Sequence, residues 1–162
     1  MSGLVSGIVG IETSPTQPCV LAITTSEISN VTGDGADYAM VFDGEVFDQN
    51  GDFASNTFTA PVGGKYLISV GIMLKGLTAV SHGYIIVKML ASNRTVRAHH
   101  ESYMAANIRD RHWINAVRIV DMDATDTVTI QLTIDGEASD VIDIQGSGDD
   151  DVMNCVSIVK VA

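Results

Sequence analysis

Three consecutive aspartates form the densest group of potential metal ligands in the sequence. Asp149, Asp150 and Asp151 follow Gly146-Ser147-Gly148, and carboxylate oxygens are the ligands that calcium prefers. If three copies of this loop met on a symmetry axis, a cation would relieve the repulsion between them. The Asp-x-Asp-x-Asp-Gly spacing of a dedicated calcium loop is absent. The segment is therefore a candidate calcium site, with a solvated acidic loop as the alternative.

The run His99-His100-Glu101 contains side chains that could bind a transition metal. In a strand, adjacent side chains point to opposite faces, so His99 and His100 could not both bind one ion. A His-x-His spacing, which would place two imidazoles on one face, is missing. We expect a polar loop or an interface here, and no metal or other cofactor apart from the calcium possibility.

Catalytic patterns are absent from the sequence. No Ser/His/Asp or Cys/His arrangement stands out, and Gly33-Asp34-Gly35 is typical of a turn rather than of a phosphate-binding loop. The two cysteines, Cys19 and Cys155, are too few for a disulfide framework or a four-ligand zinc site. We therefore predict that the protein is not an enzyme.

Composition excludes two classes of partner. The chain has 162 residues, which suits one domain, and 46% of them are hydrophobic, so it can build a core. Its net charge of −11 repels phosphate backbones, and we expect no basic stripe and no nucleic-acid partner. No apolar run approaches the roughly 18 residues of a membrane-spanning helix, so we expect no membrane partner.

The first 17 residues are expected to form an extended arm that precedes a single domain at residues 18–162. The arm has no Lys or Arg before its apolar stretch, which argues against a signal peptide and for synthesis in the host cytoplasm. Glycines interrupt its aliphatic residues, so a stable helix is not expected. Exposed aliphatic residues favour aggregation, so we predict that the arm lies against a neighbouring subunit or a shell. The alternative is an edge strand on its own domain. The anchoring side chains would be Leu4, Val5, Ile8, Val9 and Ile11.

The elements that must position these residues are strands. Val128, Ile130, Leu132 and Ile134 alternate with polar residues, which predicts a strand with one buried face. About eight to ten such segments, separated by turn signals, indicate an all-β antiparallel sandwich. Residues 98–110 fit either a short helix or an irregular strand. The other expected strands are Cys19–Thr24, Ala39–Phe42, Phe53–Thr59, Lys65–Leu74, Tyr84–Leu90, Trp113–Val120, Val141–Gln145 and Asn154–Val161.

The segment from Phe42 to Leu74 carries Asn50-Gly51, then Phe58-Thr59-Ala60-Pro61, then Gly64 and Tyr66 at the start of a long strand. In this succession of motifs it resembles the globular domains of the complement and tumour-necrosis-factor jelly-roll superfamily. Proline ends a strand, the glycines allow the chain to turn, and Tyr66 can bury its ring while its hydroxyl reaches a polar rim or a subunit boundary. The resemblance implies a jelly-roll fold and a homotrimer.

The trimer is also favoured by strands that are apolar on both faces. Tyr84–Leu90 and Asn154–Val161 have more apolar surface than one sandwich core accommodates. The first and last strands of the jelly roll that the sequence resembles pair in one sheet, so Cys19 and Cys155 are expected to be spatial neighbours with free thiols. The residues predicted at the trimer interface are Tyr66, Tyr84, Ile86, Val156 and Ile158.

These observations lead to two hypotheses for function. The first is a virion protein of a bacteriophage: a trimeric capsid decoration, head-fibre or cement protein that the arm anchors to a major capsid or other virion protein. The second is a receptor- or glycan-binding recognition module, such as a tail-fibre tip or a soluble complement-like lectin. The choice of the first follows from elimination and family analogy.

Overall fold

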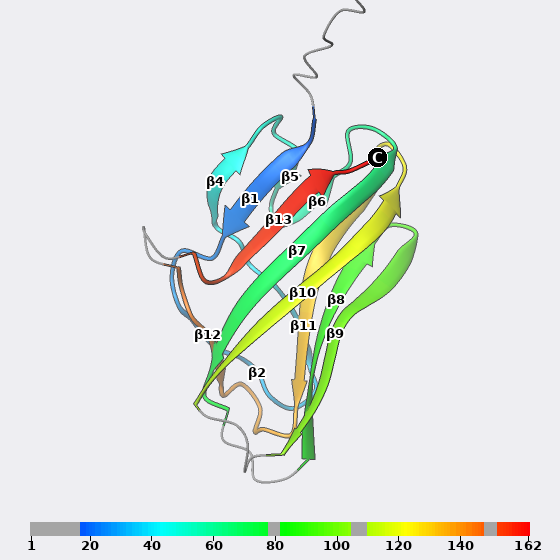
Figure 1. Ribbon diagram of the computed structural model, residues 1–162. Coiled ribbons are helices and arrows are strands. Elements are labelled where there is room, and N and C mark those ends of the chain that lie inside the picture. The colour runs from blue at the N-terminus through cyan, green and yellow to red at the C-terminus, as the bar shows by residue number, and fades with distance from the viewer. Residues whose placement is uncertain (1–16, 78–81, 105–109, 148–151) are drawn as a thin grey trace, which may run out of the picture.

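The computed structural model describes residues 17–77, 82–104, 110–147 and 152–162, and these ranges contain strands and no helix. Two antiparallel sheets face each other as a sandwich (Figure 1). The strands in chain order are β1 (Cys19–Ile23), β2 (Ile28–Thr32), β3 (Asp37–Ala39), β4 (Gly44–Asp48), β5 (Phe53–Ala54), β6 (Thr57–Thr59), β7 (Gly64–Lys75), β8 (His82–Ala91), β9 (Arg94–Met104), β10 (Arg111–Met122), β11 (Thr127–Asp135), β12 (Ile142–Ile144) and β13 (Cys155–Lys160).

The first sheet, called sheet A, is built around β7. One edge of β7 pairs with β10 along the whole length of both strands. Its other edge pairs with β13 over one half and with β12 near Leu74. Beyond β13 come β1 and then β4, and beyond β12 comes β2. Sheet A therefore ends at β10 on one side of β7, and at β4 and β2 on the other.

The second sheet, called sheet B, is built around β11. One edge of β11 pairs with β8, and β8 pairs with β9. The other edge pairs with the short strands β3 and β6, and β5 forms a hairpin with β6. Strand β9 is therefore an outermost strand of sheet B, and β10 lies beside it across the sandwich (Figure 1).

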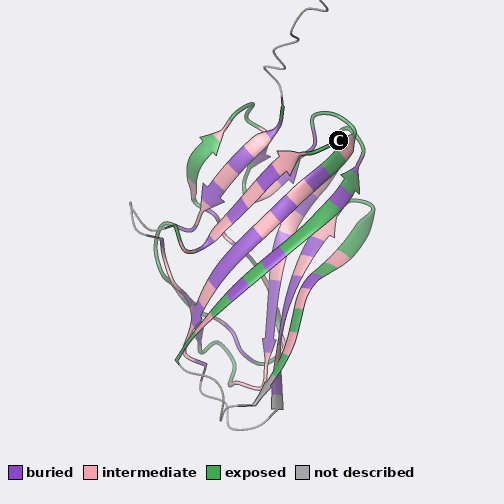
Figure 2. Cartoon of the chain, viewed as in Figure 1, coloured by how far each residue is buried: buried purple, intermediate pink, exposed green. Residues whose placement is uncertain are grey.

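The core lies between the sheets and follows the predicted period of two. Alternate residues of β7, from Tyr66 to Leu74, are buried, and so are Val128, Ile130 and Leu132 of β11. Figure 2 shows the alternation as bands along β7 and β10. Full burial of one large aliphatic or aromatic side chain contributes about 1.5–3 kcal/mol, so these stripes hold the sheets together.

The segment that contains Pro61 and Tyr66 has the structure that its residue types predict. Strand β6 ends before Pro61, and the Tyr66 ring is fully buried edge-to-face against Phe58, with ring centroids 5.3 Å apart. The Tyr66 hydroxyl donates a hydrogen bond of 2.6 Å to the carbonyl of Val62. The hydroxyl is thus satisfied by its own chain, and not at a subunit boundary.

Several predicted elements differ from the structure. Phe53–Thr59 is a hairpin rather than one strand, because Ser55 and Asn56 adopt left-handed conformations with φ of 51° and 62°. The segment at 98–110 is strand as far as Met104, and 105–109 lie outside the described residues. Strands β2 and β4 were not predicted, since most of their side chains are exposed or half-buried and lack alternation.

The first and last strands pair, as expected, but the two cysteines are not neighbours. In the β1–β13 ladder, Cys19 lies opposite Val159 and Cys155 lies opposite Ile23. The thiols are therefore four residue steps apart, or about 13 Å at the usual strand rise. That separation exceeds the roughly 7 Å between Cα atoms that a disulfide permits. Both cysteines are free.

Candidate interaction surfaces

The face of sheet A that points away from the core is largely apolar. Because strand residues alternate, the ladders place side chains of neighbouring strands in rows across this face. One row is Ile119, Leu67, Val159 and Cys19, and the next is Val117, Ser69, Ser157, Leu21 and Phe47. We call these two rows, together with Met73, Trp113, Cys155, Ile23 and the polar Asn115, the outer face of sheet A.

The most exposed part of this face lies on β10. Ile119 is 60% exposed, Val117 46% and Trp113 39%, although all three are large and apolar. Figure 2 shows the exposed bands along this strand. Water contact with a contiguous apolar patch is unfavourable, and such patches mark interaction sites on soluble proteins.

Gly71 makes the middle of the outer face flat. A Cβ atom at this position would lie 3.3 Å from Cζ2 of Trp113 and 3.5 Å from Sγ of Cys155. The absence of a side chain at Gly71 therefore lets the indole and the thiol approach the backbone of β7. Burial raises the pKa of the Cys155 thiol, while a hydrogen bond with the Gly71 backbone opposes that rise. The protonated thiol thus contributes an apolar group to the face.

The residues predicted at the trimer interface are not on the outer face of sheet A. Tyr66, Val156 and Ile158 are at most 1% exposed within one chain, because they point into the sandwich core. Their assignment to an interface needs correction, since a second chain could not reach them. Ile86 and Tyr84 lie instead on the outer side of sheet B, where the Tyr84 ring contacts His100 edge-on. The sequence signal for the outer face was the apolar character of Trp113, Val117 and Ile119 between buried residues.

The two adjacent histidines point to opposite faces, as expected. His100 lies against Tyr84, whereas Nε2 of His99 is 3.3 Å from Oε2 of Glu101. The same carboxylate oxygen is 3.0 Å from Nε2 of His112 on β10. This contact joins the two sheets at the side where β9 and β10 lie. Within the described residues, no group of three His, Cys, Asp or Glu side chains is arranged to hold a metal ion. The candidate calcium ligands Asp149, Asp150 and Asp151 lie outside the described residues.

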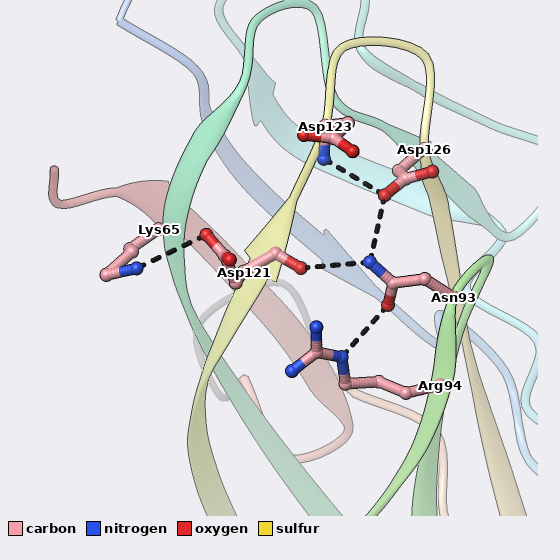
Figure 3. Close-up of polar contacts among 6 residues, drawn as sticks. All are labelled: Lys65, Asn93, Arg94, Asp121, Asp123 and Asp126. Atoms are coloured by element: carbon pink, nitrogen blue, oxygen red, sulfur yellow. Dashed lines mark hydrogen bonds and ion pairs between the residues drawn. The ribbon is translucent and has the colours of Figure 1, made fainter.

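A polar network joins the sheets at one end of the sandwich (Figure 3). Nδ2 of Asn93, in the turn before β9, donates to the carbonyl of Asp121 at 3.5 Å and to Oδ2 of Asp126 at 3.3 Å. Asp126 also accepts from the backbone N–H of Asp123 at 2.9 Å. On the other side, Oδ1 of Asn93 accepts from Nε of Arg94 at 3.0 Å. Asn93 therefore fixes the orientation of the Arg94 guanidinium group.

Comparison with known proteins identifies the fold. No family model and no curated protein matches the sequence. The globular domain of zebrafish complement 1qA protein is similar over 90% of this chain and 98% of that chain, with TM-score 0.59 and 12% identity. Murine APRIL at pH 8.0 is similar over 90% of this chain and 100% of its own, with TM-score 0.58 and 11% identity.

The fold is a TNF- and complement-like jelly roll. The predicted all-β, antiparallel sandwich is thereby confirmed. A further crystal structure of murine APRIL, at pH 5.0, matches the jelly roll with TM-score 0.56 at 8% identity and the same coverage. At such identities the likeness concerns the fold, and the predicted bacteriophage origin and capsid-decoration role receive no support. No helix in the described part of the chain is long and apolar enough to cross a membrane.

Proposed function

We propose that this jelly roll is a non-enzymatic recognition module that forms a homotrimer through the outer face of sheet A. The single observation that carries the proposal is the exposed apolar surface of β10, continued by half-buried apolar residues of β7, β13 and β1. The face has the anatomy of an interface, because charged residues stand only at its borders. Lys65 pairs with Asp121 at one border, and Lys75 pairs with Glu27 at another.

The distribution of exposed apolar residues on this face is compatible with a ring of subunits. Such residues lie at both sides of sheet A, with Trp113, Val117 and Ile119 on β10 and Phe47 on β4, and half-buried ones lie between them. A contact between these two different sides in two copies is head-to-tail, and such contacts form a ring when the rotation between copies closes. The TNF- and complement-like fold of the neighbours supports a ring of three, and their non-enzymatic class supports a recognition role.

The capsid-decoration hypothesis, with its virion location and its arm of Leu4, Val5, Ile8, Val9 and Ile11, stays a prediction. Residues 1–16 lie outside the described residues, so the structure does not test the arm or the boundary between residues 17 and 18. The recognition hypothesis is favoured over the capsid hypothesis because it needs only the jelly roll, whereas the capsid hypothesis depends on the arm.

Sedimentation equilibrium tests the proposed trimer. The wild-type protein is expected to have three times the chain mass of 17.2 kDa. Ile119→Asp places a charge in the apolar face, where an unpaired buried charge costs several kcal/mol, so this variant should sediment as a single chain. Val62→Asp is the matched control, because Val62 is 47% exposed on a turn outside the face. A wild-type monomer at micromolar concentration, or equal dissociation by both variants, would contradict the proposal.

A further inference from the structure

All five arginines of this acidic chain fall within one short segment of the sequence. They fall between Arg94 and Arg118, a segment that contains only two carboxylates, Glu101 and Asp110. The rest of the chain has four lysines against eighteen carboxylates. The expectation that the chain has no basic stripe is therefore wrong for this segment, which comprises β9, β10 and the connection between them.

The described arginines form no ion pairs with the described carboxylates. Lys65, Lys75 and Lys88 each form an ion pair with a carboxylate. Each of the four arginines within the described residues is exposed, and none of them lies at ion-pair distance from a carboxylate of those same residues. The two carboxylates of the segment already have partners: Glu101 lies between two imidazoles, and Asp110 accepts from the Gly76 backbone. The guanidinium charges are thus available to a partner from outside.

Two contacts across the sandwich hold β9 and β10 side by side. At one end, Asn93 bonds to the Asp121 carbonyl, and further along, His112 meets Glu101. β9 and β10 lie beside each other between these two contacts (Figure 1). We call this boundary between the two strands the β9–β10 seam. Arg94 lies on its β9 side and Arg118 on its β10 side, whereas Arg97, opposite Lys88 in the β8–β9 ladder, faces away from the core.

Strand alternation directs two of the arginines into the seam. Arg118 lies two positions from each of the buried residues Ala116 and Val120. Because residues two positions apart in a strand share a face, Arg118 is on the core-facing side of β10. Arg94 shares the core-facing side of β9 with Val96, which packs against the core. Both side chains are nevertheless exposed, so they extend outward between the two sheets.

The guanidinium groups of Arg94 and Arg118 each retain N–H donors that make no hydrogen bond to the described residues. Arg94 uses Nε for Asn93, and Arg118 uses one terminal nitrogen for the carbonyl of Val117. Asn93 is itself held by Asp126, so Arg94 is oriented before any ligand arrives (Figure 3). Planar guanidinium forks match the two oxygens of a carboxylate, and preorientation lowers the entropy that binding costs.

We infer that the β9–β10 seam is a docking site for a short acidic peptide segment of a partner protein, bound through Arg94 and Arg118. A compact anion is favoured over a long polyanion, because the remainder of the surface is acidic and repels any charge that extends beyond the seam. A peptide is favoured over an acidic sugar, because among the described residues β9 pairs only with β8 and β10 only with β7. Their free backbone groups can pair with an extended peptide.

Fluorescence anisotropy with a fluorescein-labelled hexaglutamate peptide tests this inference on the full chain at low salt. The double variant Arg94→Gln/Arg118→Gln is expected to weaken binding at least about tenfold, since two charge-assisted contacts are lost. Arg111→Gln is the matched control, because Arg111 is an exposed arginine of β10 outside the seam that bonds to Gln145. Its affinity should stay within about twofold of wild type.

Three results would overturn the inference. The first is absence of peptide binding by the wild-type chain, and the second is an equal loss of affinity in the seam variant and in Arg111→Gln. The third is tighter, arginine-dependent binding of trigalacturonate than of the peptide, which would assign the seam to acidic sugars. Sedimentation of the seam variant should match the wild type. Because the seam lies within one chain, the binding assay remains decisive even if the protein proves to be a monomer.

Discussion

Tyr66→Phe isolates one partly buried hydrogen bond that ties the turn after Pro61 to the core. The ring of Tyr66 is fully buried, and its hydroxyl donates to the Val62 carbonyl at 2.6 Å. The substitution keeps the ring and its contact with Phe58 but leaves the carbonyl without this donor. A buried neutral hydrogen bond contributes about 1 kcal/mol net, and an unsatisfied partner raises the loss to about 1–3 kcal/mol.

Urea denaturation followed by circular dichroism measures this loss as a change in the free energy of unfolding. We expect Tyr66→Phe to lower it by about 1–2 kcal/mol with an unchanged denaturant slope. Tyr38→Phe is the control, since the Tyr38 hydroxyl has no hydrogen-bond partner among the described residues and should cost less than about 0.5 kcal/mol. Equal stabilities of Tyr66→Phe and wild type would refute the reasoning, because the turn would then not depend on the hydroxyl.

Two further predictions concern charge and the arm. Hydrogen bonds from Lys88 and Thr133 lower the pKa of Asp37 below 3.8. Ionised Asp37 therefore stabilises the fold above its unfolded pKa, and this contribution disappears as pH falls through the lower, folded pKa. The stability difference between wild type and Asp37→Asn should thus be present at pH 7 and shrink below about pH 4 in urea titrations; a constant difference would contradict it. Deletion of residues 1–12 should leave the circular dichroism spectrum and the trimer mass unchanged if the arm is an anchor. Unfolding on deletion would instead support the edge-strand alternative.

The strands with strict alternation were predictable from the sequence, and the reason is physical. In β11 and β7 every second residue is apolar and enters one shared core, so pattern and burial coincide. Strand β4 was missed because it forms the border of sheet A, where Val46 and Phe47 are both exposed and no buried face imposes alternation. Backbone pairing with β1, rather than side-chain pattern, defines this strand.

The surfaces were harder to predict, because they depend on which residues face which side. The apolar run at β13 was interpreted as surplus surface for a trimer. In the structure, Val156 and Ile158 belong to the core, while Cys155, Ser157 and Val159 face outward. The clustering of arginines between residues 94 and 118 is a property of the sequence. Whether these arginines lie close together depends on how β9 and β10 pair with strands distant in the sequence. Only the folded chain shows that β9 and β10 are the free strands of two different sheets, with Arg118 between them.

The pairing of β1 with β13 has a consequence for how the chain acquires its structure. Sheet A joins the first strand to the last, so its central ladder cannot close until residue 160 has left the ribosome. The β8–β9 hairpin, by contrast, pairs neighbouring segments and can form early. Proteins dominated by such distant contacts fold in about milliseconds to seconds, which is slow for a chain of this size. Until the last strand arrives, β1 and β7 present unpaired, apolar edges, so nascent chains at high concentration are exposed to aggregation at this step.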